Sequence, residues 1–211
     1  MQTLAEHKQC LRSKRVLLVG SGPTDVDYAT LPAKYQDVVL VNHALTLAPL
    51  FSGSDQRVYF FTWHPEVFSA WPEFTQVNVR PCLHSGICRR LAGDRGIGIR
   101  FKNYAWQQPA VFYDAIHHAP EIRDREQIAV TNQLVSMANS MLLALHFLYY
   151  AEASQIDAVG VGRYRGVFVD RHDQRLDRLQ LEEQRPPHAA AYWEQFEAVR
   201  AALQLPITVL T

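Results

Sequence analysis

A chain of 211 residues is long enough for one substantial α/β domain, and a hydrophobic content of 48% is ordinary for a globular protein. The 21 basic and 21 acidic residues give a net charge of +0, so no general attraction to nucleic acid or to an anionic membrane is expected. The cysteines Cys10, Cys82 and Cys88 are too scattered for a disulfide framework, and no apolar run is as long as a signal-peptide core or a membrane span. These features favour a cytoplasmic protein without an integral membrane segment. They leave open peripheral attachment at the inner membrane and assembly into a homo-oligomer.

The first part of the chain predicts a series of parallel strands. Residues 15–20 and 37–42 are short apolar runs rich in β-branched residues, each ending in glycine or a polar residue, which is typical of buried strands in a parallel sheet. The segment between them is long enough for a short helical crossover. Further strands are expected at 56–65 and at 75–81.

The middle of the chain has a less regular pattern. Residues 82–128 contain glycines, prolines and charges without clean periodicity, so we expect an irregular, lid-like insertion with one or two short helices. Apolar residues at three- and four-residue steps then predict a helix over 130–153, for which Thr131 or Asn132 is suited to the N-cap.

The last part returns to an alternation of strands and helices. The pattern predicts a buried strand at 156–162, a mobile charged loop at about 163–187, a helix at 188–205 and a closing strand at 206–211. Such an alternation predicts the α/β class, with residues 1–211 forming a single Rossmann-like domain around a doubly wound, mostly parallel sheet. Ligands bind these sheets beyond the carboxyl ends of the strands.

A glycine turn after the first strand is the first candidate for a ligand contact. The turn consists of Gly20, Ser21, Gly22, Pro23 and Thr24. It lacks the third glycine of the dinucleotide fingerprint and the lysine of a P-loop, but backbone N–H groups at a helix start can hold a phosphate. The following Asp25-Val26-Asp27 matches the D-x-D pattern of metal-dependent sugar-nucleotide transferases. Carboxylates at a helix start are also favoured by the helix dipole as caps, and this is the interpretation we prefer.

Further polar residues are expected along the same edge of the sheet. Asn42 and Thr62 follow the second and third strands, and Gly162 and Tyr164 lie at the end of the strand at 156–162. The hydroxyl of Tyr164 can donate to a departing phosphate.

Two helix starts add candidates of their own. Thr131 and Asn132 combine a hydroxyl and an amide with the N–H groups of an expected helix N-terminus, which suits a phosphate or a carboxylate. His188 opens the helix at 188–205 and is a candidate general base, because an imidazole titrates near neutral pH.

The order of these motifs resembles the bacterial sialyltransferases of glycosyltransferase family 42, which add sialic acid to lipooligosaccharide. The chain reads GSGPT, DYATLP and DVVLVN where the family has G-N-G-P-S, D-Y-x-x-L-P and D-V before a strand that ends in asparagine. Farther along it reads VTNQ, a hydrophobic helix and VGVGRY where the family has I-T-S-G, a hydrophobic helix and a strand running into G-I-D-F-Y. The family's catalytic histidine precedes its last helix and strand, as PPHAAAYW does here. The match covers residues 15–65 well and 130–211 moderately.

The resemblance implies a GT-A-like sialyltransferase fold and a role in lipopolysaccharide biosynthesis. The implied reaction is an inverting, metal-independent transfer of sialic acid, or a related sugar acid, from a CMP-sugar to a glycan acceptor. The CMP-sugar is the donor substrate, and no further cofactor is implied. By position, residues 20–24 and Asn42 would hold the cytidine nucleotide, and residues 131–132 would meet the nucleotide or the donor carboxylate. Tyr164 would stabilise the leaving phosphate, and His188 would take the proton of the acceptor hydroxyl.

Two other interpretations stay open. A glycine-proline-serine turn after the first strand also occurs in pterin pyrophosphokinase-like proteins, which would make the chain a metal-dependent diphosphokinase with candidate ligands Asp25, Asp27, Asp170 and Asp173. Alternatively, the chain is a degenerate member that binds a nucleotide or sugar without turnover. This interpretation is motivated by Ala129, where the family has a basic residue, and by Phe168, where it has a second tyrosine.

Overall fold

One sheet organises the part of the chain that the computed structural model describes. That part is residues 3–22, 24–51, 53–63, 67, 78–94, 98, 101, 106, 108–116, 123–135, 139–161 and 186–210, with the side chains of the last range described from Trp193 onward. Within these residues, eight strands pair in the order β6-β5-β4-β3-β2-β1-β7-β8, and each neighbouring pair is parallel. Their bounds are β1 Arg15–Val19, β2 Asp37–Val41, β3 Arg57–Phe61, β4 Arg80–His84, β5 Val111–Ile116, β6 Gln133–Val135, β7 Gln155–Val159 and β8 Ile207–Val209.

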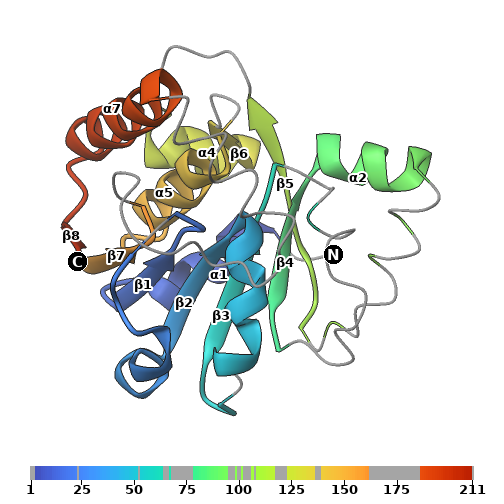
Figure 1. Cartoon of the computed structure of the whole chain (residues 1–211). Helices are drawn as coiled ribbons and strands as arrows, with labels where there is room; N and C mark the ends of the chain where they lie inside the picture. The colour runs from blue at the N-terminus through green and yellow to red at the C-terminus, as the bar shows by residue number, and fades with distance from the viewer. Residues whose placement is uncertain are drawn as a thin grey trace.

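The strand order reverses between β1 and β7. From β1 the chain adds β2 to β6 one after another on one side, and it then crosses back to place β7 and β8 on the other side of β1 (Figure 1). Val19, the last residue of β1, pairs with Leu40 of β2 and with Val159 of β7, so these three strands end at the same edge. Such a reversal is the topological switch point at which open α/β sheets bind ligands.

One face of the sheet is covered by helices α1 (Leu4–Leu11), α4 (Arg125–Thr131), α5 (Ser140–Tyr150) and α7 (Pro186–Ala202). Their apolar side chains share one core with those of the strands. In this core Phe147 of α5 packs on Tyr59 and Phe61 of β3, with ring centroids 5.4 and 5.1 Å apart. Almost every residue of α5 is buried, which explains why its sequence is apolar on all sides.

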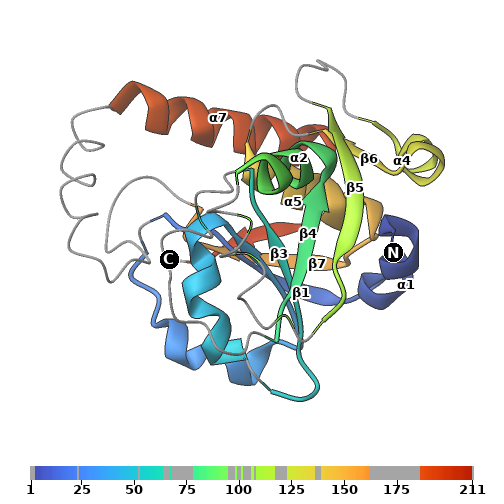
Figure 2. The same ribbon diagram turned by 90° about the vertical axis from the view of Figure 1, so that its right-hand side faces the viewer.

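Short 3-10 helices cover the opposite face, across the sheet from α1 (Figure 2). The crossover from β1 to β2 consists of η1 (Tyr28–Thr30) and η2 (Pro32–Lys34), and η3 (Asn42–Phe51) leads from β2 to β3. Phe51 of η3 and Phe60 of β3 are fully buried in this second core. Helix α2 (Ser85–Gly93) connects β4 to β5 and packs Leu91 against the same core.

The structure confirms the α/β class and the doubly wound sheet, which is parallel throughout the described residues. The strands expected at 15–20, 37–42, 56–65 and 156–162 correspond to β1, β2, β3 and β7. The last expected helix and the closing strand correspond to α7 and β8. No helix in the described ranges is both long enough and apolar enough to cross a membrane.

Three expectations for the middle of the chain differ from the structure in whole or in part. β4 spans Arg80–His84, so the fourth strand overlaps the expected range 75–81 only at residues 80 and 81. The segment 82–128 contains the short helix α2, as expected, but its described parts also contribute the sheet strand β5, which was not expected. The helix expected over 130–153 is interrupted: α4 ends at Thr131, β6 follows, and α5 begins only at Ser140.

Candidate functional site

Glycines and polar residues follow the strands at the carboxyl edge of the sheet. Residues 20–22 follow β1, Asn42 follows β2, Thr62 and Trp63 follow β3, and Gly160 follows β7. Because the strands are parallel and paired in register, these residues lie along one edge of the sheet. That edge contains the switch point between β1 and β7, which makes it the candidate functional site.

Gly20, Gly22 and Gly160 form a backbone contact across the switch point. The amide of Gly22 donates to the carbonyl of Gly160 at 2.8 Å, and the amide of Gly20 donates to that of Val159 at 2.8 Å. A Cβ at Gly22 would lie 2.6 Å from the Gly160 oxygen, and Gly160 itself has a φ of 66°. Two N–H groups of the turn are therefore already hydrogen-bonded to backbone carbonyls of the protein. The first role of these glycines is to join the ends of β1 and β7.

Asn42 is held in one orientation at the end of β2. Its backbone is left-handed, with a φ of 54°, a conformation that asparagine tolerates better than most residues. Its side-chain Oδ1 accepts a hydrogen bond from Oγ1 of Thr62 at 3.0 Å. Thr62 is fully buried, whereas Asn42 is partly exposed. Asn42 is thus a residue of the expected nucleotide site that presents a side-chain amide at this edge.

The N-terminus of α5 reaches the same edge. Asn139 caps the helix by accepting from the amide of Met141 at 2.8 Å, and the hydroxyl of Ser140 accepts from the amide of Trp63 at 2.7 Å. The ring of Trp63 stacks on the imidazole of His84, with centroids 4.1 Å apart and planes at 9°. The sequence signal for this helix start is Asn139 directly before a long apolar run, which lies inside the range 130–153 expected to be one helix.

Thr131 and Asn132 do not lie at this edge, which corrects their assignment to the nucleotide site. Thr131 is the last residue of α4, and Asn132 ends that helix with a left-handed φ of 53°. Asn132 directly precedes β6, so both residues are at the amino edge of the sheet. The side chain of Asn132 accepts from the amide of Leu4 at 3.0 Å and donates to the carbonyl of Phe112 at 2.9 Å. Its role is to join α1 to β5.

Several expected site residues lie outside the described part of the structure. Pro23, Gly162 and Tyr164 are among them, as is the expected loop 163–187 up to residue 185. His188 lies in the first turn of α7, as expected for a residue that opens the last helix, but its side chain is not among those described. Their roles stay predictions.

The paired aspartates after the glycine turn have distinct surroundings. The carboxylate of Asp27 accepts from the amide of Ala29 at 2.9 Å and so caps η1, the role that the sequence favoured. Thr24 forms a similar local turn, because its hydroxyl accepts from the amide of Val26 at 3.1 Å. Asp25 is exposed. Within the described residues, no three or more His, Cys, Asp or Glu side chains are grouped as a metal site would need.

The hydroxyl of Tyr28 is buried beside the switch point. Its oxygen would lie 3.0 Å from a Cβ built on Gly160, and it has no hydrogen-bond partner among the described residues. Burial raises the pKa of this phenol well above its usual range, so the hydroxyl stays protonated. Tyr28 belongs to the DYATLP segment but was not expected to lie near the site. No sequence pattern could have placed a residue of η1 against the glycine that follows β7.

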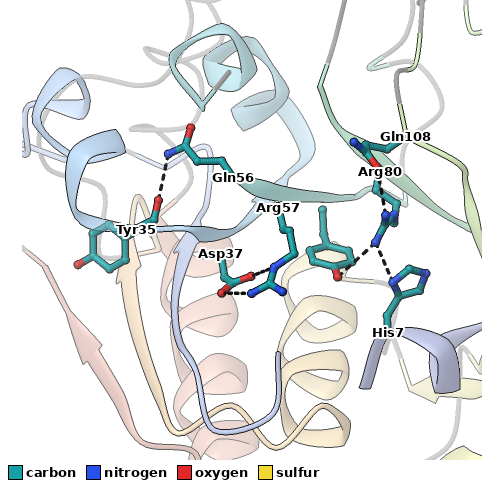
Figure 3. Close-up of polar contacts among 8 residues, drawn as sticks. His7, Tyr35, Asp37, Gln56, Arg57, Arg80 and Gln108 are labelled. Atoms are coloured by element: carbon teal, nitrogen blue, oxygen red, sulfur yellow. Dashed lines mark hydrogen bonds and ion pairs between the residues drawn. The ribbon is translucent and has the colours of Figure 1, made fainter. Parts of the chain in front are cut away.

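The amino edge of the sheet carries a separate hollow of about 780 Å³. Lys14, Arg15, Lys34 and Gln56 are among the residues that line it. The buried carboxylates near it already have partners. Asp157 accepts from Arg15 Nε at 2.6 Å and from the Tyr35 hydroxyl at 2.7 Å. The other, Asp37, accepts from Nε and Nη2 of Arg57 at 2.6 and 2.8 Å (Figure 3). These contacts join β7 to the start of β1 and the start of β2 to that of β3, so we assign this edge a structural role.

A second polar cluster lies under α1 at the start of β4. Nη1 of Arg80 lies 2.8 Å from Nδ1 of His7 and 3.4 Å from the Tyr59 hydroxyl, and Nη2 donates to Gln108 at 3.1 Å (Figure 3). Since arginine has only donors, Nδ1 of His7 must be the acceptor. Burial and the charge of Arg80 lower the pKa of His7 to about 4, so His7 is neutral at pH 7.

Two of the three thiols are disfavoured as nucleophiles. Cys10, Cys82 and Cys88 are all free, in agreement with the sequence analysis. Cys82 is fully buried, and this burial raises the pKa of its thiol. Burial also raises the pKa of Cys88. A thiolate is therefore disfavoured at these two positions near neutral pH.

Comparisons with models of protein families, with curated proteins and with solved structures find no match to this chain.

Proposed function

We propose that the chain binds a CMP-activated sugar acid at the carboxyl edge of the sheet and transfers the sugar to a glycan acceptor. The observation that carries this proposal is the switch point between β1 and β7, with the glycine turn at its centre and Asn42 beside it. Doubly wound sheets bind nucleotides at such a point, because the first connections on its two sides leave the sheet on opposite faces.

The polar groups at this edge favour a ligand that accepts hydrogen bonds. Asn42 is partly exposed and carries two N–H donors on Nδ2, and the N-terminus of α5 brings a positive dipole end to the same edge. A nucleoside monophosphate offers acceptors in both its phosphate and its pyrimidine ring. The described part of the edge therefore suits the CMP portion of the donor.

The identity of the transferred group comes from the resemblance to family 42 sialyltransferases. The strands that carry the matching motifs are adjacent in the sheet, since β1 lies between β2 and β7. The glycine turn, Asn42 and the segment after β7 are thereby brought to one edge. This arrangement supports the interpretation that the matching motifs form one site, and it adds a structural argument to the sequence resemblance.

The proposed reaction is a single displacement. The acceptor hydroxyl oxygen forms a bond to the anomeric carbon, and the bond between that carbon and the phosphate oxygen breaks, so CMP leaves with the bonding electrons. His188 takes the proton of the acceptor hydroxyl, and Tyr164 donates a hydrogen bond to the leaving phosphate. No metal is assigned to this step, because Asp27 already caps η1.

A thermal-shift panel tests the proposal and its rivals together. CMP, CDP, ATP and CMP-sialic acid are each added at millimolar concentration, with and without Mg²⁺. The proposal expects stabilisation by CMP and by CMP-sialic acid, independent of Mg²⁺. Stabilisation by ATP only in the presence of Mg²⁺ would replace it with the diphosphokinase interpretation. No shift with any cytidine nucleotide would end the CMP assignment.

A further inference from the structure

The ends of β2 and β3 are joined by one side-chain hydrogen bond. Val41 and Phe61 are paired in the parallel ladder, so the next residues of the two strands, Asn42 and Thr62, leave the sheet side by side. Oγ1 of Thr62 donates to Oδ1 of Asn42 at 3.0 Å. Thr62 has no exposed surface, so a ligand at this edge cannot touch its hydroxyl without rearrangement.

We propose that Thr62 is a positioning residue that fixes the Asn42 amide with its N–H donors outward, so that the site selects groups that accept hydrogen bonds. This inference rests on the proposed function and concerns the same nucleotide site. It also changes the role expected for Thr62, which acts through Asn42 and not by direct contact with the nucleotide.

The chemistry of the amide gives the selectivity. A primary amide presents an acceptor on one side and two donors on the other, and its orientation decides which of these a ligand meets. Because the buried hydroxyl of Thr62 donates to Oδ1, it draws that oxygen toward the end of β3, and Nδ2 on the other side of the amide is the group that we assign to the ligand. The matching ligand atom is an oxygen or ring nitrogen with a lone pair. In a cytidine nucleotide such atoms are O2 and N3 of the base and the phosphate oxygens.

Both partners of this bond are themselves held in place. Asn42 is fixed by its left-handed backbone at the start of η3. Thr62 is fixed through its neighbour, because the amide of Trp63 donates to the Ser140 hydroxyl at 2.7 Å and Ser140 is buried. The Asn42 side chain therefore has a rigid support on the strand side, as a preorganised binding group requires.

The test uses the full chain and isothermal titration with CMP. Thr62→Val removes the hydroxyl and keeps the shape, and it is expected to weaken CMP binding by about tenfold, because the amide loses its orientation and Oδ1 loses its partner. Thr62→Ser keeps the hydroxyl and is expected to retain affinity within about twofold. Tyr35→Phe is the matched control, since it removes a hydroxyl that donates to Asp157 at the opposite edge and should leave CMP affinity unchanged.

A second variant keeps the inference testable if Thr62→Val does not fold. Asn42→Asp preserves an acceptor for Thr62 and tolerates the left-handed backbone, but it replaces the outward donors with a carboxylate oxygen. CMP affinity should then fall by about fiftyfold or more. Titration with cytidine distinguishes the two sources of acceptor atoms. A loss for CMP and cytidine alike places Nδ2 against the base, and a loss for CMP alone places it against the phosphate.

Failure of the inference differs from failure of the proposed function. If wild-type protein binds CMP and Thr62→Val binds it equally well, Thr62 does not position Asn42. The inference is also wrong if Thr62→Ser binds CMP as weakly as Thr62→Val does, or if Asn42→Asp keeps the wild-type affinity for CMP. If the wild-type protein binds no cytidine compound, the proposed function itself is wrong, and the inference falls with it.

Discussion

The α-carbon of Gly160 lies directly against the carbonyl of Gly20, so that a Cβ at Gly160 would come within 2.5 Å of that oxygen. The contact joins the turns after β1 and β7 and leaves no room for a side chain between them. Gly160 also has a φ of 66°, which residues with a Cβ rarely adopt. The contact and this backbone angle together explain why a glycine follows β7.

Gly160→Ala should therefore destabilise the protein by about 2–4 kcal/mol, since it combines a left-handed backbone with a backbone clash. Chemical denaturation with an unchanged m-value measures this difference. Gly93→Ala is the control, because a Cβ at Gly93 in α2 meets nothing within 4 Å. A Gly160→Ala protein as stable as the Gly93→Ala protein would contradict the tight contact.

The burial of His7 beside Arg80 predicts a loss of stability in acid. The pKa of His7 is lowered from 6.5 to about 4 in the folded protein. Between these values the unfolded chain binds the proton more readily, so the stabilisation is complete above pH 6.5 and is lost as the pH falls toward 4. The linked loss is about 3 kcal/mol.

His7→Asn separates this effect from other acid effects. The amide oxygen of asparagine can accept from Arg80 but does not titrate. Unfolding free energies measured from pH 7 to pH 4 should fall less steeply for His7→Asn than for the wild type. The variant keeps His146, whose pKa burial also lowers. Equal pH slopes for the two proteins would show that His7 is not the responsible group.

The capping role of Asp27 predicts that nucleotide binding does not depend on a metal. EDTA should leave the affinity for CMP unchanged. Asp27→Asn should also bind CMP normally, because asparagine caps a helix as well as aspartate does, whereas it is a poorer cation ligand. If nucleotide binding instead required Mg²⁺ or Mn²⁺ and was lost in Asp27→Asn, the diphosphokinase interpretation would be supported. Calorimetric titration with and without the metal measures both outcomes.

The assignment of His188 predicts a specific loss of turnover. His188→Ala should lower the rate of sugar transfer by about 10²–10⁴, the usual span for a general base, and leave CMP affinity nearly unchanged. Tyr164→Phe should also lower the rate but keep the acidic limb of the pH–rate profile, which reports the histidine. Near wild-type transfer by His188→Ala would refute the assignment. A wild-type protein that binds CMP but transfers no sugar would favour the degenerate-binder interpretation.

The buried strands could be predicted from the sequence because their signal is local. β1, β2, β3 and β7 are short apolar runs that end in a polar residue or glycine, which is the pattern of a strand covered on both faces. β4 and β5 do not have this pattern. β4 contains Pro81, and β5 contains the exposed Asp114, and neither strand could be recognised without its neighbours in the sheet.

The interruption of the expected helix at 130–153 depends on tertiary contacts. Asn132 adopts a left-handed backbone because its side chain bridges Leu4 of α1 and Phe112 of β5, two segments far from it in sequence. Residues 133–135 then pair with β5 as a strand. The spacing of apolar residues is compatible with a continuous helix, so periodicity alone could not place the break.

The candidate site could be predicted in part for the same physical reason. Residues that directly follow a buried strand, such as Gly20 and Asn42, must lie at its carboxyl edge, so their position follows from the strand assignment. Thr131 and Asn132 were misplaced because their assignment relied on a helix start that does not exist. The contact of Tyr28 with Gly160 and the burial of Thr62 arise only when separate segments pack together.

The most direct test of the central claim is the affinity of the full chain for CMP, measured by isothermal titration on the wild type and on Asn42→Asp. The account predicts a dissociation constant between micromolar and millimolar for the wild type, which corresponds to about 4–8 kcal/mol. It predicts that Asn42→Asp binds CMP about fiftyfold more weakly, or worse, at unchanged thermal stability. No binding by the wild type would contradict a CMP site at the carboxyl edge of the sheet, and equal binding of CMP by both proteins would contradict a nucleotide contact at Asn42.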